Sequence, residues 1–250
     1  MFKKNLAILM LLFLFSNPLF ARRPLRVDDS DIASYRKSEL ETGLEYHLYS
    51  RRAGNIESIF VPLKYSYGLT REWEAAVTVP FVDYRSGLKM LSSVSFHTKY
   101  VLPFFRNTRN QKTALEFIVY LPSFSTRGFS QWEDVLKTGM NLSFTQDYAR
   151  FKLYENIGYT IVSKSESMNT KNVVNAGLGM EKKLNSFLFL VSELEARSSN
   201  LPGRDDSLAN IFLGFKYCSS SNFIVDFGIG VGMGKGSSDF RGSTGITYLF

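Results

Sequence analysis

The chain has 250 residues, of which 44% are hydrophobic, 15% aromatic and 21% charged, and its formal net charge is +7. This length suits one large domain or two small ones. After the N-terminal 21 residues no apolar run is long enough for a membrane-spanning helix, which excludes a helical membrane protein. Many aromatic residues at a mean hydropathy of only −0.09 indicate that apolar residues are spread singly among polar ones.

The N-terminus has the features of a secretory signal peptide. Lys3 and Lys4 form a basic start, LAILMLLFLF is the apolar core, and NPLFA leads to an expected cleavage after Ala21. Without these two lysines the formal net charge falls from +7 to +5. Cys218 is the single cysteine of the sequence, so no internal disulfide is expected.

From residue 39 onward one pattern repeats, in which about ten alternating apolar and polar residues are followed by turn residues. We predict twelve strands, near residues 39–49, 57–68, 73–84, 93–103, 113–122, 135–146, 150–162, 172–183, 187–197, 207–217, 222–233 and 240–250. Soluble sandwich strands also alternate, but they are typically about 5–6 residues long, whereas a bilayer-spanning strand needs about 9–11. Strand length, even number and secretory signal therefore predict an all-β transmembrane antiparallel β-barrel in a bacterial outer membrane, with about 12 strands and a range of about 10–14.

The predicted domains are a signal peptide (1–21), an N-terminal periplasmic or lumen-plug segment (22–38) and the barrel (39–250). With a periplasmic N-terminus, the short connections LTRE, QDYA, KLN and SSSN fall on the periplasmic side, and PFFRNTRNQ is the long exception. Aromatic pairs with outward parity flank these turns, as an interfacial girdle requires; they are Tyr67 and Trp73, Phe144 and Phe151, Tyr217 and Phe223, and Tyr248 and Phe250. The terminal Phe250 also resembles the signal by which barrel-assembly machinery recognises its substrates.

Two predicted strands alternate less cleanly. Glu155 has the parity of its apolar neighbours Ile157 and Tyr159, and Glu193 and Glu195 have the parity of two phenylalanines. We expect a β-bulge, or a position in the interfacial zone, to accommodate each of these strands.

The N-terminal third of the mature chain carries a family resemblance. Pro24 to Asp29 form a Pro-Leu-x-Thr-Asp-Asp-like box with Val27 in place of Thr, and Glu39 to Tyr46 form a Glu-Leu-Glu-x-Gly-x-Glu-Tyr-like strand. These motifs, with VPLKYSYGLTREWEAAVTVPF and HTKYVLPF, resemble the outer-membrane proteins grouped as the MetA-pathway of phenol degradation family. The resemblance covers roughly the first hundred residues and implies a transporter of small hydrophobic or aromatic molecules.

Parity places a set of ionisable side chains in the lumen: Glu45, His47, Lys64, Glu74, His97, Lys99, Glu116 and Asp226. If the following turn is centred near residues 107 and 108, Lys99 and Glu116 lie directly opposite, and we predict a cross-strand ion pair. The pair would either belong to the solute path or only brace the wall.

An enzyme is not expected. An outer-membrane lipid hydrolase would need Ser, His and an acidic partner at a lipid-facing site. His47 and His97 instead face the lumen, and no nucleophile motif flanks them. A hydrolase would require a nucleophile within reach of either histidine. The acidic run VDDSD at 27–31 has too few ligands and no glycine turn for a calcium loop, so it predicts a turn or plug segment. No metal and no cofactor are implied.

Pro62 and Pro80 are unusual residents of a barrel wall because proline donates no ladder hydrogen bond. They lie at nearly the same height on neighbouring strands, with Pro122 at a similar outer height. One hypothesis is an interruption between the second and third strands that permits a side opening. The alternative is a pair of tolerated bulges.

The stretch GIGVGMGKG at 228–236 is not a phosphate loop, because Lys235 is followed by Gly236 rather than Ser or Thr. Gly228, Gly230 and Gly232 instead leave a bare inner stripe on one strand. We predict that the N-terminal segment, or a solute, packs against this stripe.

The predicted function is passage of small, hydrophobic or aromatic solutes across the outer membrane. The alternatives are a structural or surface-interaction barrel and, further off, a lipid hydrolase. The expected partners are outer-membrane lipid, small hydrophobic solutes and the barrel-assembly machinery, the last through the strand that ends at Phe250; no nucleic acid partner is expected.

Overall fold

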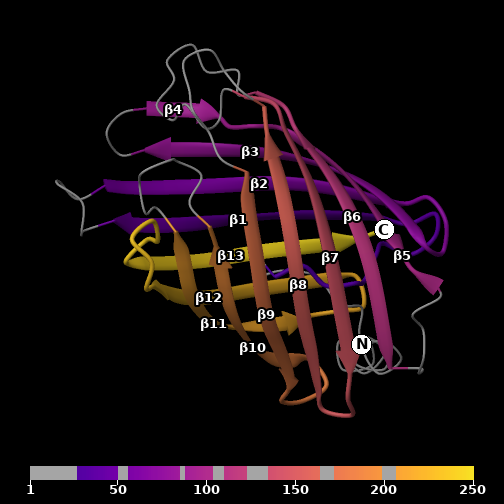
Figure 1. Ribbon diagram of the computed structural model, residues 1–250. Coiled ribbons are helices and arrows are strands. Elements are labelled where there is room, and N and C mark those ends of the chain that lie inside the picture. The colour runs from indigo at the N-terminus through magenta and orange to yellow at the C-terminus, as the bar shows by residue number, and fades with distance from the viewer. Residues whose placement is uncertain are drawn as a thin grey trace, which may run out of the picture.

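A computed structural model describes residues 27–49, 56–84, 88–103, 110–122, 135–163, 172–198 and 207–250. These residues form one antiparallel sheet whose edges meet, so that the strands enclose a barrel (Figure 1). No helix within these ranges is long and apolar enough to cross a membrane.

The described sheet has thirteen strands. They are β1 (Ser38–Tyr49), β2 (Ile56–Gly68), β3 (Trp73–Tyr84), β4 (Leu88–Leu91), β5 (Ser95–Val101), β6 (Gln111–Tyr120), β7 (Lys137–Asp147), β8 (Phe151–Val162), β9 (Val173–Lys183), β10 (Leu188–Arg197), β11 (Leu208–Cys218), β12 (Phe223–Gly232) and β13 (Phe240–Leu249). Neighbouring strands in the chain pair with each other, except that β4 and β5 both pair with β3 and not with one another, and β1 pairs with β13 to close the ring.

Strands β4 and β5 are two parts of one crossing. We call the end of the barrel with the short turns and Phe250 the periplasmic end, after the orientation expected from the sequence, and the opposite end the outer end. β5 pairs with the periplasmic half of β3 and β4 with its outer half, and residues 92–94 separate them. The barrel therefore has twelve crossings, which confirms the predicted fold and strand number. The sequence pattern predicted a strand at 93–103, which covers β5, but did not predict β4.

The chain end is part of the wall. The Ser38 amide donates to the Phe250 carbonyl at 2.7 Å, and the Phe250 amide donates back to Ser38 at 2.9 Å. The last residue thus completes the β1–β13 ladder at the periplasmic rim. Leu69 and Tyr148 start tight turns by donating their amides to Trp73 and Phe151 at 2.8 Å each.

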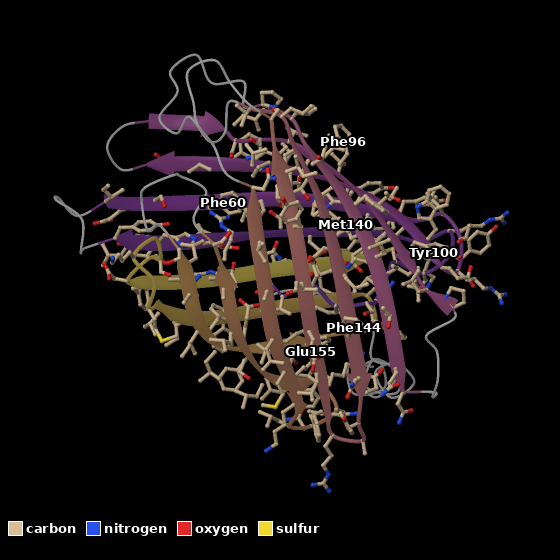
Figure 2. All side chains as sticks on the ribbon, in the orientation of Figure 1. Phe60, Phe96, Tyr100, Met140, Phe144 and Glu155 are labelled. Atoms are coloured by element: carbon tan, nitrogen blue, oxygen red, sulfur yellow. The ribbon has the colours of Figure 1, made fainter. Side chains whose placement is uncertain are left out.

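The two faces of the sheet are chemically opposite. Ionisable side chains fill the inner face, and Glu74, Lys99 and Asp226 are each 1% exposed. Apolar side chains cover the outer face, where Ile229 is 60% exposed. Figure 2 shows this outer surface, on which Phe96, Tyr100 and Met140 are labelled. A soluble sandwich has the reverse arrangement, whereas a wall surrounded by lipid requires this one.

The two poorly alternating strands need no bulge. The β7–β8 ladder runs without a gap from Lys137 opposite Val162 to Asp147 opposite Lys152, so the prediction of a bulge in β8 is wrong. Glu155 lies exposed on the outer face opposite Phe144 (Figure 2). In β10 the glutamates do share the parity of Phe189, and this parity faces the lumen, where Glu193 and Phe189 are both buried. The lumen accepts an aromatic ring as well as carboxylates, which alternation alone does not distinguish.

Candidate functional site: the lumen and its N-terminal segment

Residues 27–37, here called the inner segment, lie inside the ring of strands (Figure 1). At the periplasmic rim the segment joins the wall through Gly68, whose amide donates to Lys37 and whose carbonyl accepts from Arg36 at 2.9 Å. Arg36 has a φ of 59°, in the left-handed region, which turns the chain from the lumen into β1. A Cβ at Gly68 would lie 2.2 Å from the Ser34 carbonyl oxygen, so only glycine allows this approach.

The middle of the inner segment is bonded to opposite walls. The Ala33 amide donates to Glu74 Oε2 of β3 at 2.6 Å. Across the lumen, Ser30 donates its amide to Thr145 Oγ1 at 2.9 Å and its hydroxyl to the Ser143 carbonyl at 2.8 Å, both on β7. Ser30 is fully buried. The segment therefore spans the barrel interior near its periplasmic end.

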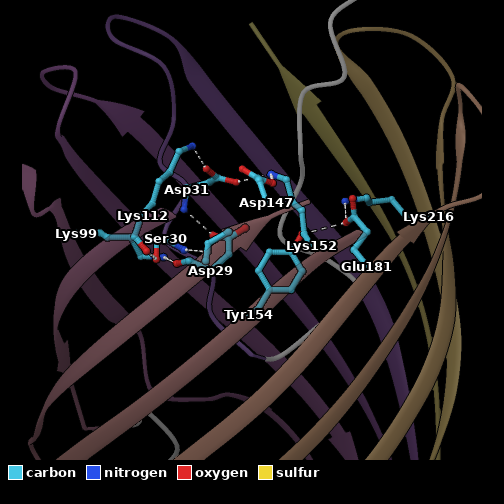
Figure 3. A network of polar contacts seen from close by, with 11 residues as sticks. Asp29, Ser30, Asp31, Lys99, Lys112, Asp147, Lys152, Tyr154, Glu181 and Lys216 are labelled. Carbon is cyan, nitrogen blue, oxygen red and sulfur yellow. Dashed lines mark hydrogen bonds and ion pairs between the residues drawn. The ribbon is translucent and has the colours of Figure 1, made fainter. Parts of the chain in front are cut away.

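Asp31 makes the densest set of contacts (Figure 3). Its two carboxylate oxygens form ion pairs with Lys112 of β6 and, at 3.2 Å, with Lys152 of β8. Asp147 of β7 also pairs with Lys152 at 3.2 Å. Burial alone would raise the pKa of Asp31, but Lys152 and Lys112 outweigh it and hold this pKa below its ordinary value. We call this cluster of Asp31, Lys112 and Lys152 the latch.

The far end of the inner segment reaches mid-barrel height. The Val27 amide donates to Glu193 Oε2 of β10 at 2.8 Å, and Asn141 of β7 donates to Asp28. Val27 is 4% exposed and packs on Gly177, where an added Cβ would lie 2.5 Å from Val27 Cγ2. The glycine in β9 thus makes room for the segment.

Further ion pairs brace the lumen, and the first of them lies beside the latch, because Glu181 is the cross-strand partner of Lys152. Glu181 of β9 pairs with Lys216 of β11 and accepts from the Tyr154 hydroxyl at 3.3 Å (Figure 3). Arg241 of β13 lies 3.4 Å from Glu45 of β1. Buried charges of this kind are costly unless paired, and here they come in opposite-sign contacts.

All eight ionisable residues that the sequence assigned to the lumen have inward side chains in the structure: Glu45, His47, Glu74, Lys99, Glu116 and Asp226 are buried, and Lys64 and His97 are half-buried. Lys99 and Glu116 are direct cross-strand neighbours. Lys99 Nζ donates to the Asp29 carbonyl at 3.0 Å, and Glu116 Oε1 lies 3.1 Å from His97 Nδ1. The ion pair between Lys99 and Glu116 stays a prediction.

Each histidine lies between a hydroxyl group and a carboxylate. His97 Nε2 is 2.8 Å from Ser95 Oγ and its Nδ1 faces Glu116; His47 is 3.4 Å from Ser238 Oγ and 3.3 Å from Glu45 Oε2. The atoms match those of a catalytic triad, but both serines are buried, and neither lines the lumen cavities described below. Sequence reasoning missed these serines because no motif marks them.

The glycine stripe of β12 has a different occupant from the one predicted. A Cβ at Gly228 would lie 2.3 Å from the Phe212 ring, and one at Gly230 would lie 3.0 Å from it. At Gly232 the near atoms belong to residues 237 and 238. The prediction that the N-terminal segment packs here is wrong for residues 27–37, which contact other strands. Phe212, on neighbouring β11, fills the stripe, and Arg241 lies 4.7 Å over its ring.

Pro62 and Pro80 are direct partners across β2 and β3. Leu69 and Trp73 form a hydrogen-bonded pair at the turn. Hydrogen-bonded and non-hydrogen-bonded pairs alternate along an antiparallel ladder, and the proline pair is seven steps further along, so it is a non-hydrogen-bonded pair. Their nitrogens therefore face outward from the pair, toward β1 and β4. In agreement, the Pro80 carbonyl accepts from Ser92 at 2.9 Å.

The β2–β3 ladder is continuous, so the predicted interruption between these strands is wrong. The hydrogen-bonded pairing is instead interrupted on either side of this strand pair, next to β1 and next to β4 and β5. The β1–β2 pairing skips from Leu63 to Phe60, and the β3 pairing shifts from Ser95 to Leu91, with one extra residue on the β4–β5 side, which is a bulge.

Two cavities lie on either side of the inner segment. The outer cavity, of about 250 Å³, is bounded by Val27 and Asp28 and by side chains of β6 to β10. The periplasmic cavity, of about 230 Å³, lies between residues 30–34, Arg71, Glu72, residues 101–103 and Lys112. The segment thus lines both cavities, with Val27 and Asp28 at the outer one and residues 30–34 at the periplasmic one. Among the described residues no group of three or more His, Cys, Asp or Glu side chains could hold a metal ion.

No known protein family model and no curated protein sequence matches this chain. Solved structures do match. A KdgM porin has a TM-score of 0.57 and 10% identity, covering 85% of this chain and 99% of the porin. A NanC porin has a TM-score of 0.57 and 10% identity, covering 84% and 98%. The CymD monoaromatic hydrocarbon channel has a TM-score of 0.50 and 9% identity, covering 86% and 88%.

The fold, with its polar lumen and apolar outer face, is that of outer-membrane β-barrel porins and channels. Identities of 9–10% establish the fold alone. The resemblance to the MetA-pathway family therefore stays a hypothesis.

Proposed function

We propose that this protein is an outer-membrane channel for small solutes, kept closed by its N-terminal inner segment. The observation that carries the proposal is the set of bonds from one short segment to several strands: Ala33 to β3, Asp31 to β6 and β8, and Val27 to β10. A segment that only filled space would need fewer directional contacts. Because these bonds go to side chains of the wall, the segment can undock as a plug without breaking the backbone ladder of the sheet.

The solute class expected from the family resemblance is hydrophobic or aromatic. The fold is compatible with this class, since the similar CymD structure is a monoaromatic hydrocarbon channel. It is equally compatible with sugars, since a KdgM porin structure contains oligogalacturonate. An apolar solute would meet a lumen rich in buried charges, so its path would favour an exit through the wall.

The proposed lateral opening lies beside the proline pair rather than within it. Pro80 removes the donor that would face the β4–β5 strand, and β4 pairs only with β3 among the described strands. Phe81 and Phe96, 50% and 51% exposed, mark the lipid side of this region. An apolar solute in the lumen would leave toward the bilayer there.

The test is single-channel conductance of the refolded mature chain in a planar bilayer, compared with a variant that lacks residues 22–34. Residues 35–38 are kept because they bond to Gly68 and Phe250 at the rim. Rare steps in the full chain and frequent steps in the variant are expected. Silence in both, with a correctly folded barrel, would refute the gated channel and favour a structural or surface-interaction role. The C-terminal strand as the signal for barrel assembly is a separate proposal, tested by insertion of a chain with Phe250→Ser.

A lipid hydrolase is the second candidate, favoured by the Ser95–His97–Glu116 contacts, which are shorter than those of Ser238, His47 and Glu45. Release of fatty acid from phospholipid by the wild type, abolished by Ser95→Ala and kept by Ser238→Ala, would establish it. Equal background rates in all three proteins would exclude it.

A further inference from the structure

The charged side chains that line the outer cavity balance one another. They are two cations, Lys137 and Arg197, and two anions, Asp28 and Glu195. Each is already engaged with the protein: none of Lys137, Arg197 and Asp28 is without a partner, and Glu195 accepts from Asn210 Nδ2 at 3.4 Å. A charged solute would therefore bury its charge here without a spare counter-ion among the described lining residues, which favours an uncharged solute.

A row of uncharged amides crosses the wall of this cavity. Asn141 of β7, Gly158 of β8 and Asn175 of β9 are direct cross-strand neighbours on the inner face. A Cβ at Gly158 would lie 2.5 Å from Asn175 Oδ1 and 2.6 Å from Asn141 Oδ1. The two amides thus lean over the glycine from both sides, and their oxygens face the same space.

The amide oxygen of Asn141 lacks a donor. Asn141 is 5% exposed, and its Nδ2 donates to Asp28 of the inner segment. Its Oδ1 accepts no hydrogen bond from the described residues. A buried acceptor left unpaired is unfavourable, and an O–H group that enters the cavity would satisfy it. The position of this oxygen therefore indicates a ligand that carries hydroxyl donors.

The surroundings of the amide row fit the rest of such a ligand. Thr160 of β8 lies one row further out, opposite Gly139, and Asn156 lies one row deeper. A Cβ at Gly139 would lie 3.7 Å from both Ile118 and Tyr120 of β6, so an apolar edge adjoins the polar rows. The volume of about 250 Å³ is below the roughly 300–1,000 Å³ of drug-sized sites, which limits the occupant to a small molecule.

We propose that the outer cavity binds a small uncharged polyhydroxylated solute of the monosaccharide or cyclic polyol class, which rests on the proposed channel function and names its solute. Its hydroxyl groups donate to the oxygens of Asn141 and Asn175, and its carbon face packs on Ile118. A hydrocarbon leaves the amide oxygens unsatisfied, and a sugar acid buries a carboxylate without a spare cation.

The test measures binding at equilibrium, by titration calorimetry of the refolded full mature chain in detergent, which requires no transport. The probes are D-glucose, D-glucuronate, which adds a carboxylate, and cyclohexanol, a ring of similar size with a single hydroxyl group. Glucose is expected to bind at least about tenfold more tightly than cyclohexanol, because several hydrogen bonds are lost, and than glucuronate, because its charge is unpaired.

Two substitutions locate the site within the barrel. Asn175→Leu removes one amide at similar size and should weaken glucose binding about fivefold. Asn175 is chosen because Asn141 also holds the inner segment. Thr160→Val should weaken binding about threefold. Its matched control is Thr78→Val on β3, which removes a half-buried lumen hydroxyl that lies 3.3 Å from a histidine nitrogen and does not line the cavity, and should bind glucose like the wild type.

The outcomes separate the site from the channel. Glucuronate bound as tightly as glucose would overturn the choice of an uncharged solute, and cyclohexanol bound as tightly would overturn the role of the hydroxyl groups. Wild-type affinity in both Asn175→Leu and Thr160→Val would refute this cavity as the site. No binding of glucose by the wild type refutes the site even if conductance establishes the channel. Binding without conductance would refute the channel and leave the site in place.

Discussion

From β7 to β12 each strand pairs with its neighbours without a gap, whereas from β1 to β5 the wall is broken at two places. The continuous wall supplies Lys152, Glu193 and Asn141, which bind the inner segment. The broken wall carries Pro62 and Pro80 and the residues that split β4 from β5.

The comparison indicates a division of roles within one barrel. Uninterrupted ladders hold side chains at fixed heights, which a plug latch and a binding cavity require. Missing ladder donors lower the cost of separating strands locally, which a side opening would require. The two walls should therefore respond differently to substitution.

We expect the largest effect from Asp31→Asn, which removes the charge of the latch. Charge-assisted contacts contribute about 1.5–3 kcal/mol, so the open fraction in single-channel recordings should rise about 10–100-fold. Asp147→Asn is the control, because Asp147 contacts the same Lys152 but belongs to the wall. Equal open fractions in the two variants would contradict the latch.

Gly228→Ala tests the continuous wall itself. The new methyl group would collide with Phe212 at 2.3 Å, and overpacking of this kind costs about 1–3 kcal/mol. We expect a lower urea midpoint of unfolding. Gly242→Ala on neighbouring β13, whose Cβ would lie 3.6 Å from Phe240, should change the midpoint little. A similar loss in both variants would show that backbone effects, not the ring, are responsible.

Glu155→Leu should stabilise the same wall. Glu155 lies four residues from Phe151, which at 3.3 Å per residue and a tilt of about 40° places it about 10 Å inside the apolar band. Replacing an exposed carboxylate there should increase the free energy of unfolding by about 1–2 kcal/mol in lipid vesicles. Glu72→Leu, in a periplasmic turn, serves as the control and should have little effect. No gain from Glu155→Leu would place this carboxylate in a polar contact within the membrane.

Pro62→Thr and Pro80→Thr should make the broken wall resemble the continuous one. Each adds an amide donor toward β1 or β4, worth about 1 kcal/mol of unfolding free energy. If the lateral opening operates, the double variant should also take up an apolar probe such as toluene more slowly. Pro122→Thr, beyond the end of β6, is the control. Unchanged uptake in a stabilised double variant would refute the opening.

The smallest effect is expected from mild acid. Lys152 and Lys112 hold the pKa of Asp31 below its ordinary value of 3.8 despite burial. A carboxyl group with a depressed pKa stabilises the docked segment above the ordinary value, and this contribution is lost only as pH falls below it. The open fraction should therefore be the same at pH 7 and pH 5 and rise below about pH 4. A large rise between pH 7 and pH 5 would assign closure to other groups.

Much of the fold could be predicted because alternation is local. The predicted strand at 150–162 agrees with β8 at Phe151–Val162, and Glu74 and Lys99, to which the sequence gave inward parity, are buried. The acidic run at 27–31 was assigned to a turn or plug, but its partners Lys112 and Lys152 were not identified. Only a chain path across the barrel brings them together, at separations of 81 and 121 residues.

The sequence by itself determined which residues alternate, where the turns fall and which side chains point inward, because a period of two is a property of each strand alone. The tertiary structure decided which neighbour fills each space. Phe212 rather than the N-terminal segment covers Gly228. Pro62 and Pro80 fall on a non-hydrogen-bonded pair, so their nitrogens, which carry no hydrogen to donate, face away from each other. Both outcomes depend on register and on contacts distant in the chain, which local pattern does not contain.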